Sequence, residues 1–74
     1  TDTELLKNII AKSGLKLDYL AKKCDISRQS LTNKIMNRSL FTAKEIDILC
    51  KELKIVNLVE KEHVFFVKKL KKMS

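Results

Sequence analysis

The chain has 74 residues, no proline and one glycine, which predicts one small helical domain with short connections. It contains neither an apolar run long enough for a membrane span nor a signal-peptide pattern, so we expect no insertion or export. Sixteen Lys and Arg against nine Asp and Glu give a formal charge of +7. That balance favours a polyanionic partner, although lysine-rich helices can also serve solubility alone.

The basic residues are unevenly distributed along the chain. Seven of them, against two acids, lie between Lys16 and Lys44. Four more lysines follow Val67 with no acid among them. We therefore expect a positive field around the middle of the chain and a basic tail.

The first helix is expected to run from Thr1 or Thr3 to about Ser13. Either threonine can cap its start, and Gly14 suits a left-handed end. Its inward side chains are expected to be Leu6, Ile9 and Ile10.

Residues 17–36 predict two short helices joined by a tight turn, because apolar residues recur at helical spacing on both sides of it. Ala21 is small enough to let two helices cross closely at a steep angle. Burying the apolar side chains turns a polar face of the second helix outward. The apolar set is Leu20, Ala21, Cys24, Ile26, Leu31 and Ile35, and the outward set is Arg28, Gln29, Thr32, Asn33 and Met36.

A further helix has the clearest start signal in the chain. Thr42 and Glu45 have the spacing of a capping box, with Phe41 and Ile46 placed for the accompanying hydrophobic staple. Ile48 lies off the inner stripe, so it is expected to cover another element or a partner subunit. The stripe itself is Ile46, Leu49, Cys50 and Leu53.

The segment after Ile55 leaves two structures open. Asn57 and Glu60 can start a helix, and we favour a short one over about residues 57–63 followed by an extended or strand segment, because Val64-Phe-Phe-Val67 is strand-like. In the alternative the helix continues, with Val59, His63, Phe66, Val67 and Leu70 on one face.

Phe65 and Phe66 are hard to bury together in so small a monomer. We expect at least one of the two rings to lie in a dimer interface, because an exposed ring lacks the roughly 1.5 to 3 kcal/mol of stabilisation that burial provides. The alternative is that both rings complete the monomer core.

Residues 17–36 resemble the helix-turn-helix of the phage Cro and repressor family. Ala21 stands where the family pattern asks for alanine, and Ile26 and Leu31 stand where it asks for apolar residues. Its later apolar anchor, Ile35, follows the variant that Cro proteins use. The chain departs from the family pattern at two places. Asp25 stands at the turn where Gly is usual, and we expect it to adopt a left-handed conformation there, at modest cost. Leu17 stands where Gln usually opens the first helix.

The resemblance covers residues 3 to about 56. It implies an all-α, compact, lambda-repressor-like domain of four to five helices. The DNA-binding helix-turn-helix domain would occupy residues 1–56, and residues 57–74 would form a C-terminal segment with a possible dimerisation element, short strand or arm.

The family likeness also implies the function. The chain would be a transcription regulator, expected to be a repressor, that binds a two-fold symmetric operator in double-stranded DNA as a homodimer through the major groove. It would act in the nucleoid of the cytoplasm of a bacterial or phage-infected cell. The implied base-reading residues are Arg28, Gln29, Thr32 and Asn33. The implied phosphate contacts are Lys16, Ser27, Asn37, Arg38, Ser39 and Lys44. Lys34 lies beside the buried face of the second helix, so we expect from it a phosphate contact or none.

Other classes of function are disfavoured or kept as alternatives. His63 has no nucleophile at a recognisable spacing, so we expect no enzyme. Cys24 and Cys50 are expected in the core, with no zinc site, cofactor or small-molecule ligand. The runner-up is a protein-binding modulator or antirepressor that keeps the fold but docks on a partner protein.

Overall fold

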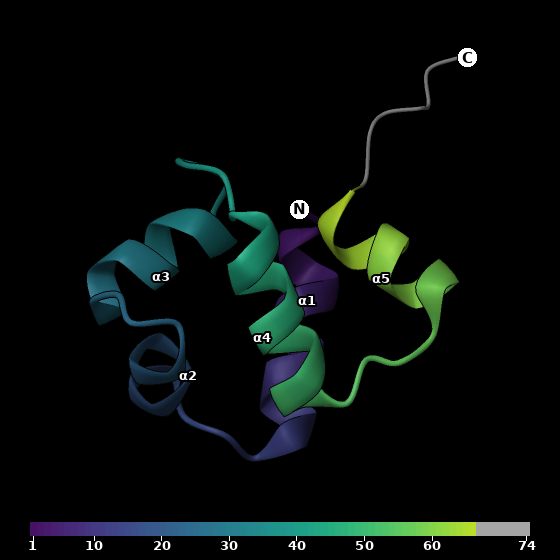
Figure 1. The fold of residues 1–74 in the computed structure, drawn as a ribbon, viewed down its shortest axis with the longest axis horizontal. Helices are drawn as coiled ribbons and strands as arrows, with labels where there is room; N and C mark the ends of the chain where they lie inside the picture. The colour runs from purple at the N-terminus through teal and green to yellow at the C-terminus, as the bar shows by residue number, and fades with distance from the viewer. Residues whose placement is uncertain (67–74) are drawn as a thin grey trace.

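The computed structural model describes residues 1–66, which form five helices and no strand. These are α1 (Thr3–Ser13), α2 (Leu17–Lys23), α3 (Arg28–Ile35), α4 (Ala43–Leu53) and α5 (Leu58–Phe65). Figure 1 shows α2 and α3 at one end, α1 and α4 in the middle and α5 at the other end. The prediction of an all-α chain is confirmed for these residues, and none of the five helices is long and apolar enough to cross a membrane.

The starts of α4 and α5 agree with the predicted capping residues, and the start of α1 does not. Thr42 and Glu45 form the predicted capping box of α4, and the Asn57 carboxamide accepts hydrogen bonds at the start of α5. The predicted cap of α1 was wrong, because Asp2 holds that position and its carboxylate accepts from the Leu5 amide. Aspartate is among the strongest N-caps, and its charge also suits the positive end of the helix.

Three of the five helices end at a non-glycine residue in the left-handed conformation: Asp25, Asn37 and Lys54, with φ between 60° and 66°. In each case the next residue donates its amide to the carbonyl five positions back, which closes the helix end. The left-handed conformation foreseen for Asp25 is therefore present. The predicted end of α1 at Gly14 is also confirmed, with φ 76°.

The core draws one fully buried side chain from each helix, namely Leu6, Leu20, Leu31, Leu49 and Val64. Cys24 and Cys50 are buried free thiols among these residues, as predicted. The α4 stripe is buried as expected, and Ile48 packs partly buried against the same core.

The predicted extended segment after residue 63 was wrong as far as Phe65, where α5 ends. Val64 and Phe65 are buried on the inner face of α5, so tertiary packing overrides the strand preference of these residue types. Phe65 meets Phe41 edge to face, with ring centroids 5.5 Å apart. The expectations for residues 67–74, including the basic tail, lie outside the described residues.

The two neighbouring phenylalanines are used differently. Phe65 is only 6% exposed, so it completes the monomer core and has little surface left for the predicted dimer interface. Phe66 stays 48% exposed, so of the pair it alone remains suited to that role.

The first three residues form a tether between distant parts of the chain. The Asp2 amide donates to the Val64 carbonyl at 2.7 Å. The Thr3 hydroxyl donates to the Ile35 carbonyl at 2.6 Å, and the Asn37 side-chain amide donates to the Thr1 carbonyl at 2.8 Å. The tether thus joins the end of α3 to α5.

Candidate nucleic-acid interface

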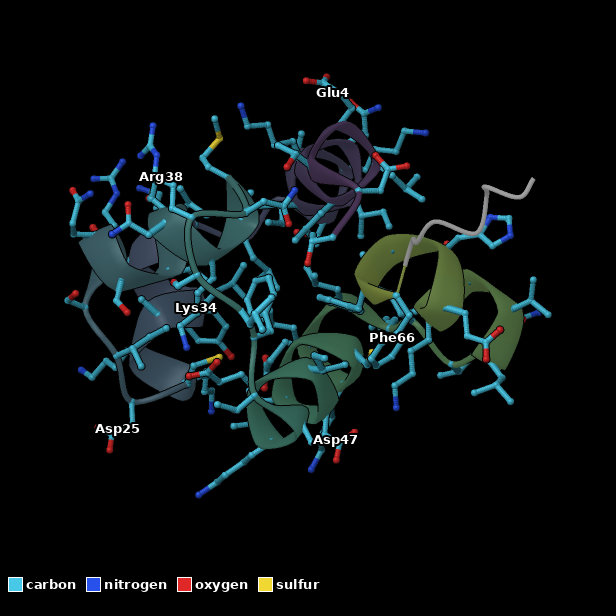
Figure 2. The ribbon with its side chains drawn as sticks, turned by 90° about the horizontal axis from the view of Figure 1, so that it is seen from above. Glu4, Asp25, Lys34, Arg38, Asp47 and Phe66 are labelled. Carbon is cyan, nitrogen blue, oxygen red and sulfur yellow. The ribbon has the colours of Figure 1, made fainter. Side chains whose placement is uncertain are left out.

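The packing of α2 against α3 decides which face of α3 is exposed. Leu20 and Ala21 from α2 and Leu31 from α3 are buried together in the core. The small side chain of Ala21 lets the two helices approach closely. Ser27 begins α3, and its hydroxyl oxygen accepts from the Ser30 amide. The opposite face of α3 and the loop that follows it remain open to solvent, with Arg38 projecting from that side in Figure 2.

Gln29, Asn33 and Arg38 form a hydrogen-bonded cluster on the open side of α3. The Gln29 Nε2 donates to Asn33 Oδ1 at 3.2 Å, and Arg38 Nη1 donates to the same oxygen at 3.3 Å. Gln29 and Arg38 are exposed, and Asn33 is half-buried between them. The structure therefore brings together two of the predicted base readers and one predicted phosphate contact.

The other two predicted base readers have different surroundings. Arg28 is exposed and its Nε lies 3.6 Å from the Asp18 carboxylate on α2. An exposed pair of this kind contributes little to stability and can exchange partners at small cost. Thr32 is half-buried, and together with Leu17 and Met36 it lines an apolar hollow of about 290 Å³ beside α1.

Lys34, a predicted phosphate contact, is engaged elsewhere. Its Nζ donates to Glu45 Oε1 at 2.6 Å, and the two side chains are only 12% and 10% exposed. Figure 2 shows Lys34 directed toward the interior, away from the open face of α3. The prediction for Lys34 does not agree with this geometry, because moving the amine to a phosphate would leave Glu45 ionised and buried without its partner.

Glu45 has three hydrogen bonds at the junction of α3 and α4. Its Oε1 accepts from Lys34 and from the Thr42 amide, while its own amide donates to the Thr42 hydroxyl. Burial alone would raise the pKa of the Glu45 carboxyl, but the hydrogen bonds from Lys34 and Thr42 outweigh burial, so its pKa lies below the ordinary value. The carboxylate thus stays ionised and fixes α3 to the start of α4.

The remaining predicted phosphate contacts fall into two groups. Lys16, Ser39 and Lys44 are exposed, Lys16 at the start of α2 and Lys44 in the first turn of α4. Asn37 is exposed, and its side-chain amide donates to the Thr1 carbonyl and the Thr3 hydroxyl of the tether, while its left-handed backbone ends α3. Of the seven basic residues between positions 16 and 44, Lys34 is the one with a buried amine.

Asp18 and Glu45 were not predicted as partners of the site residues. The pairs join residues on different helices, and helical periodicity carries no signal for such contacts. The only hint was the position of Lys34 beside the buried face of α3.

Among residues 1–66, no group of three or more His, Cys, Asp or Glu side chains is arranged to hold a metal ion. Burial raises the pKa of both the Cys24 and the Cys50 thiol, which suits packing rather than nucleophilic chemistry. The chain matches no protein-family model, no curated protein and no solved structure.

Proposed function

We propose that the protein is a sequence-specific, DNA-binding transcription regulator of the Cro and repressor type, in which α2 and α3 act as a helix-turn-helix. The observation that carries the proposal is the Gln29, Asn33 and Arg38 cluster on the open side of α3. Amide and guanidinium groups are the side chains that best match base edges in the major groove. A cluster held by hydrogen bonds enters the groove already ordered, which lowers the entropy lost on binding.

The exposed basic residues on and near α3 support a polyanionic partner. Arg28 and Arg38 are exposed on or beside α3, and Lys16 and Lys44 are exposed at the starts of the neighbouring helices. Lysine and arginine that neutralise phosphates release counterions, so affinity for DNA is expected to fall steeply as salt rises. These residues would position the protein on the backbone while α3 reads the bases.

The proposal includes a homodimer on a two-fold symmetric operator, which acts as a repressor by occupying a promoter. Half-sites would then lie about 34 Å apart, or a multiple of that, so that two copies of α3 enter the groove on one face of the duplex. Exposed apolar side chains on and beside α5 would supply the contact between copies, and they include Leu58, Val59 and Phe66.

The proposal is tested by selecting random duplexes on the purified protein and measuring the affinity of the enriched site by fluorescence anisotropy. We expect a two-fold symmetric site and a steep negative dependence of log affinity on log salt. Gln29→Ala should cost roughly 1 to 3 kcal/mol on this site and little on random DNA. The matched control, Lys44→Ala, should weaken both by the same factor, because a phosphate contact carries no sequence information. Failure to enrich any site would contradict the proposal.

A second candidate is a modulator or antirepressor that docks on a partner protein. The observation that favours it is the group of exposed apolar residues before and along α5, where Val56 is 93% exposed and Leu58 is 68% exposed. Patches of this kind mark contact surfaces. Tight capture of a partner protein that is lost in Leu58→Asp, together with no DNA binding at low salt, would favour this candidate over the first.

A further inference from the structure

The orientation of the Asn33 side chain is fixed by the chemistry of its neighbours. A guanidinium has donors and no acceptor, so the Asn33 atom 3.3 Å from Arg38 Nη1 must be the oxygen. The Gln29 atom that meets the same oxygen must then be its amide nitrogen. Both hydrogen bonds end on Asn33 Oδ1, which uses both of its acceptor positions and leaves Nδ2 as the free group.

The backbone places Arg38 where its side chain can reach Asn33. Asn37 adopts the left-handed conformation with φ 66°. This turn brings the Arg38 amide to the Asn33 carbonyl, at 2.8 Å. The bond from the Asn37 side chain to the Thr1 carbonyl holds the turn in place. Arg38 is therefore attached to Asn33 twice, once by backbone and once by side chain.

We propose that Arg38 is a positioning residue that holds Asn33 as a pure hydrogen-bond donor, so that Asn33 reads a keto base, guanine or thymine. This inference rests on the DNA-binding function proposed above. An unrestrained asparagine can present its oxygen or its nitrogen, and it can bond adenine with both. With Oδ1 occupied, Asn33 offers only the hydrogens of Nδ2.

The four bases differ in whether their major-groove edge presents a keto oxygen or an amino group. Guanine presents the acceptors O6 and N7, and thymine presents the acceptor O4. Adenine and cytosine instead present an amino group where guanine and thymine have the keto oxygen, and its hydrogens would face those of Nδ2. Adenine shares the N7 acceptor with guanine, so the discrimination against adenine comes from the contrast between its N6 amino group and the guanine O6. Gln29 differs from Asn33, because it donates one Nε2 hydrogen to the cluster and keeps its oxygen free. Gln29 thus retains the donor and acceptor pair that matches adenine.

The test is a parallel selection of random duplexes on the wild type, Arg38→Met and Lys44→Met. The two variants lose the same charge, and Lys44 is exposed and outside the cluster. The base pair read by Asn33 is identified as the one whose preference disappears in Asn33→Ala. At this pair we expect the wild type to favour keto over amino bases by about fivefold to tenfold, the effect of one net hydrogen bond. Arg38→Met should reduce that ratio toward one, and Lys44→Met should leave it unchanged.

The isosteric variant Asn33→Asp provides a second test, in which the expected base preference is the reverse of that of the wild type. In Asn33→Asp the oxygen facing Gln29 and Arg38 is retained, and the outward nitrogen becomes an acceptor oxygen. We expect the preference at the same pair to invert toward adenine or cytosine, although the added negative charge lowers affinity for all DNA.

The possible failures are distinguishable. If the wild type enriches no site, the proposed function fails. If it enriches a site but Arg38→Met keeps the keto preference, or changes only a pair that Asn33→Ala leaves intact, Arg38 does not position Asn33 and the inference is overturned while the function stands. A keto preference retained in Asn33→Asp would also overturn it.

Discussion

Replacing Lys34 with methionine is expected to destabilise the fold more than removing any exposed lysine. Methionine keeps the length of the side chain and removes the charge. Lys34 Nζ and Glu45 Oε1 are 2.6 Å apart and largely buried, so the gross attraction between the charges is about 6 kcal/mol at an effective dielectric constant near 20. Part of this attraction offsets the free energy needed to remove the Lys34 amine from water. The methionine variant buries no amine, so it does not incur that desolvation cost.

The net loss is set by what the variant leaves behind. Removing one partner from a buried pair costs about 3 to 5 kcal/mol, because the other charge stays buried and unpaired. Glu45 keeps its hydrogen bond from the Thr42 amide, so we expect the lower end, about 3 kcal/mol. For a chain of this size that corresponds to a fall in Tm of roughly 12 to 24 °C.

Urea and thermal unfolding followed by circular dichroism measure this loss, with Lys44→Met as a control expected to change stability by less than about 0.5 kcal/mol. The double variant Lys34→Met/Glu45→Gln should recover much of the loss, because it leaves no unpaired charge. A Lys34→Met loss below about 0.5 kcal/mol, or additive losses in the double variant, would refute the reasoning.

The same pair predicts a change with pH. In the wild type the pKa of Glu45 is lowered, so its contribution to stability is present above the ordinary carboxyl pKa, near 4.3, and is lost as pH falls through the folded-state pKa. Without Lys34 only the hydrogen bonds from Thr42 oppose the effect of burial, so the pKa of Glu45 is higher in the variant than in the wild type, and acidification relieves the cost of the buried charge at higher pH. The stability gap between wild type and Lys34→Met should therefore narrow from pH 7 to about pH 4, and a constant gap would contradict this account.

Three further predictions concern single sites. Lys54→Gly should raise the free energy of unfolding by about 1 kcal/mol, because glycine adopts the left-handed conformation of Lys54 without strain; a loss of stability in urea unfolding would contradict this. Ser27→Ala should cost about 1 kcal/mol in the same assay by removing the cap of α3, whereas an unchanged midpoint would show that the cap is unimportant. The thiols of Cys24 and Cys50 are buried and have raised pKa values. They should therefore react far more slowly with an aromatic disulfide reagent at pH 8 in the folded protein than in the urea-unfolded protein. Equal rates would show that the thiols are accessible in the folded protein.

Local sequence signals predicted most of the helix boundaries, because caps and apolar spacing act over a few residues. Thr42 and Asn57 begin helices as expected, and Asp25 adopts the left-handed turn. The left-handed conformation of Lys54 had no such signal, since lysine has no preference for it. Phe65 was assigned to a strand-like run, and only its packing against Phe41 reveals why it is helical.

The candidate site was predictable as a set of residues and not as a set of contacts. The exposed face of α3 follows from the burial of Leu31 and Ile35. The pairing of Lys34 with Glu45 depends on how α3 and α4 meet, which no local pattern specifies. The shared acceptor on Asn33 likewise depends on the turn at Asn37, which directs Arg38 back along the helix.

The tether at the start of the chain also provides a built-in spectroscopic probe. The Asp2 amide precedes α1, so it is outside that helix's own hydrogen bonds, and its acceptor is the Val64 carbonyl on α5. Its hydrogen can therefore be protected from exchange with solvent only while α5 is docked. The exchange rate of this one proton, followed by NMR, sets an upper limit on how often α5 leaves the rest of the domain, independently of DNA or any partner.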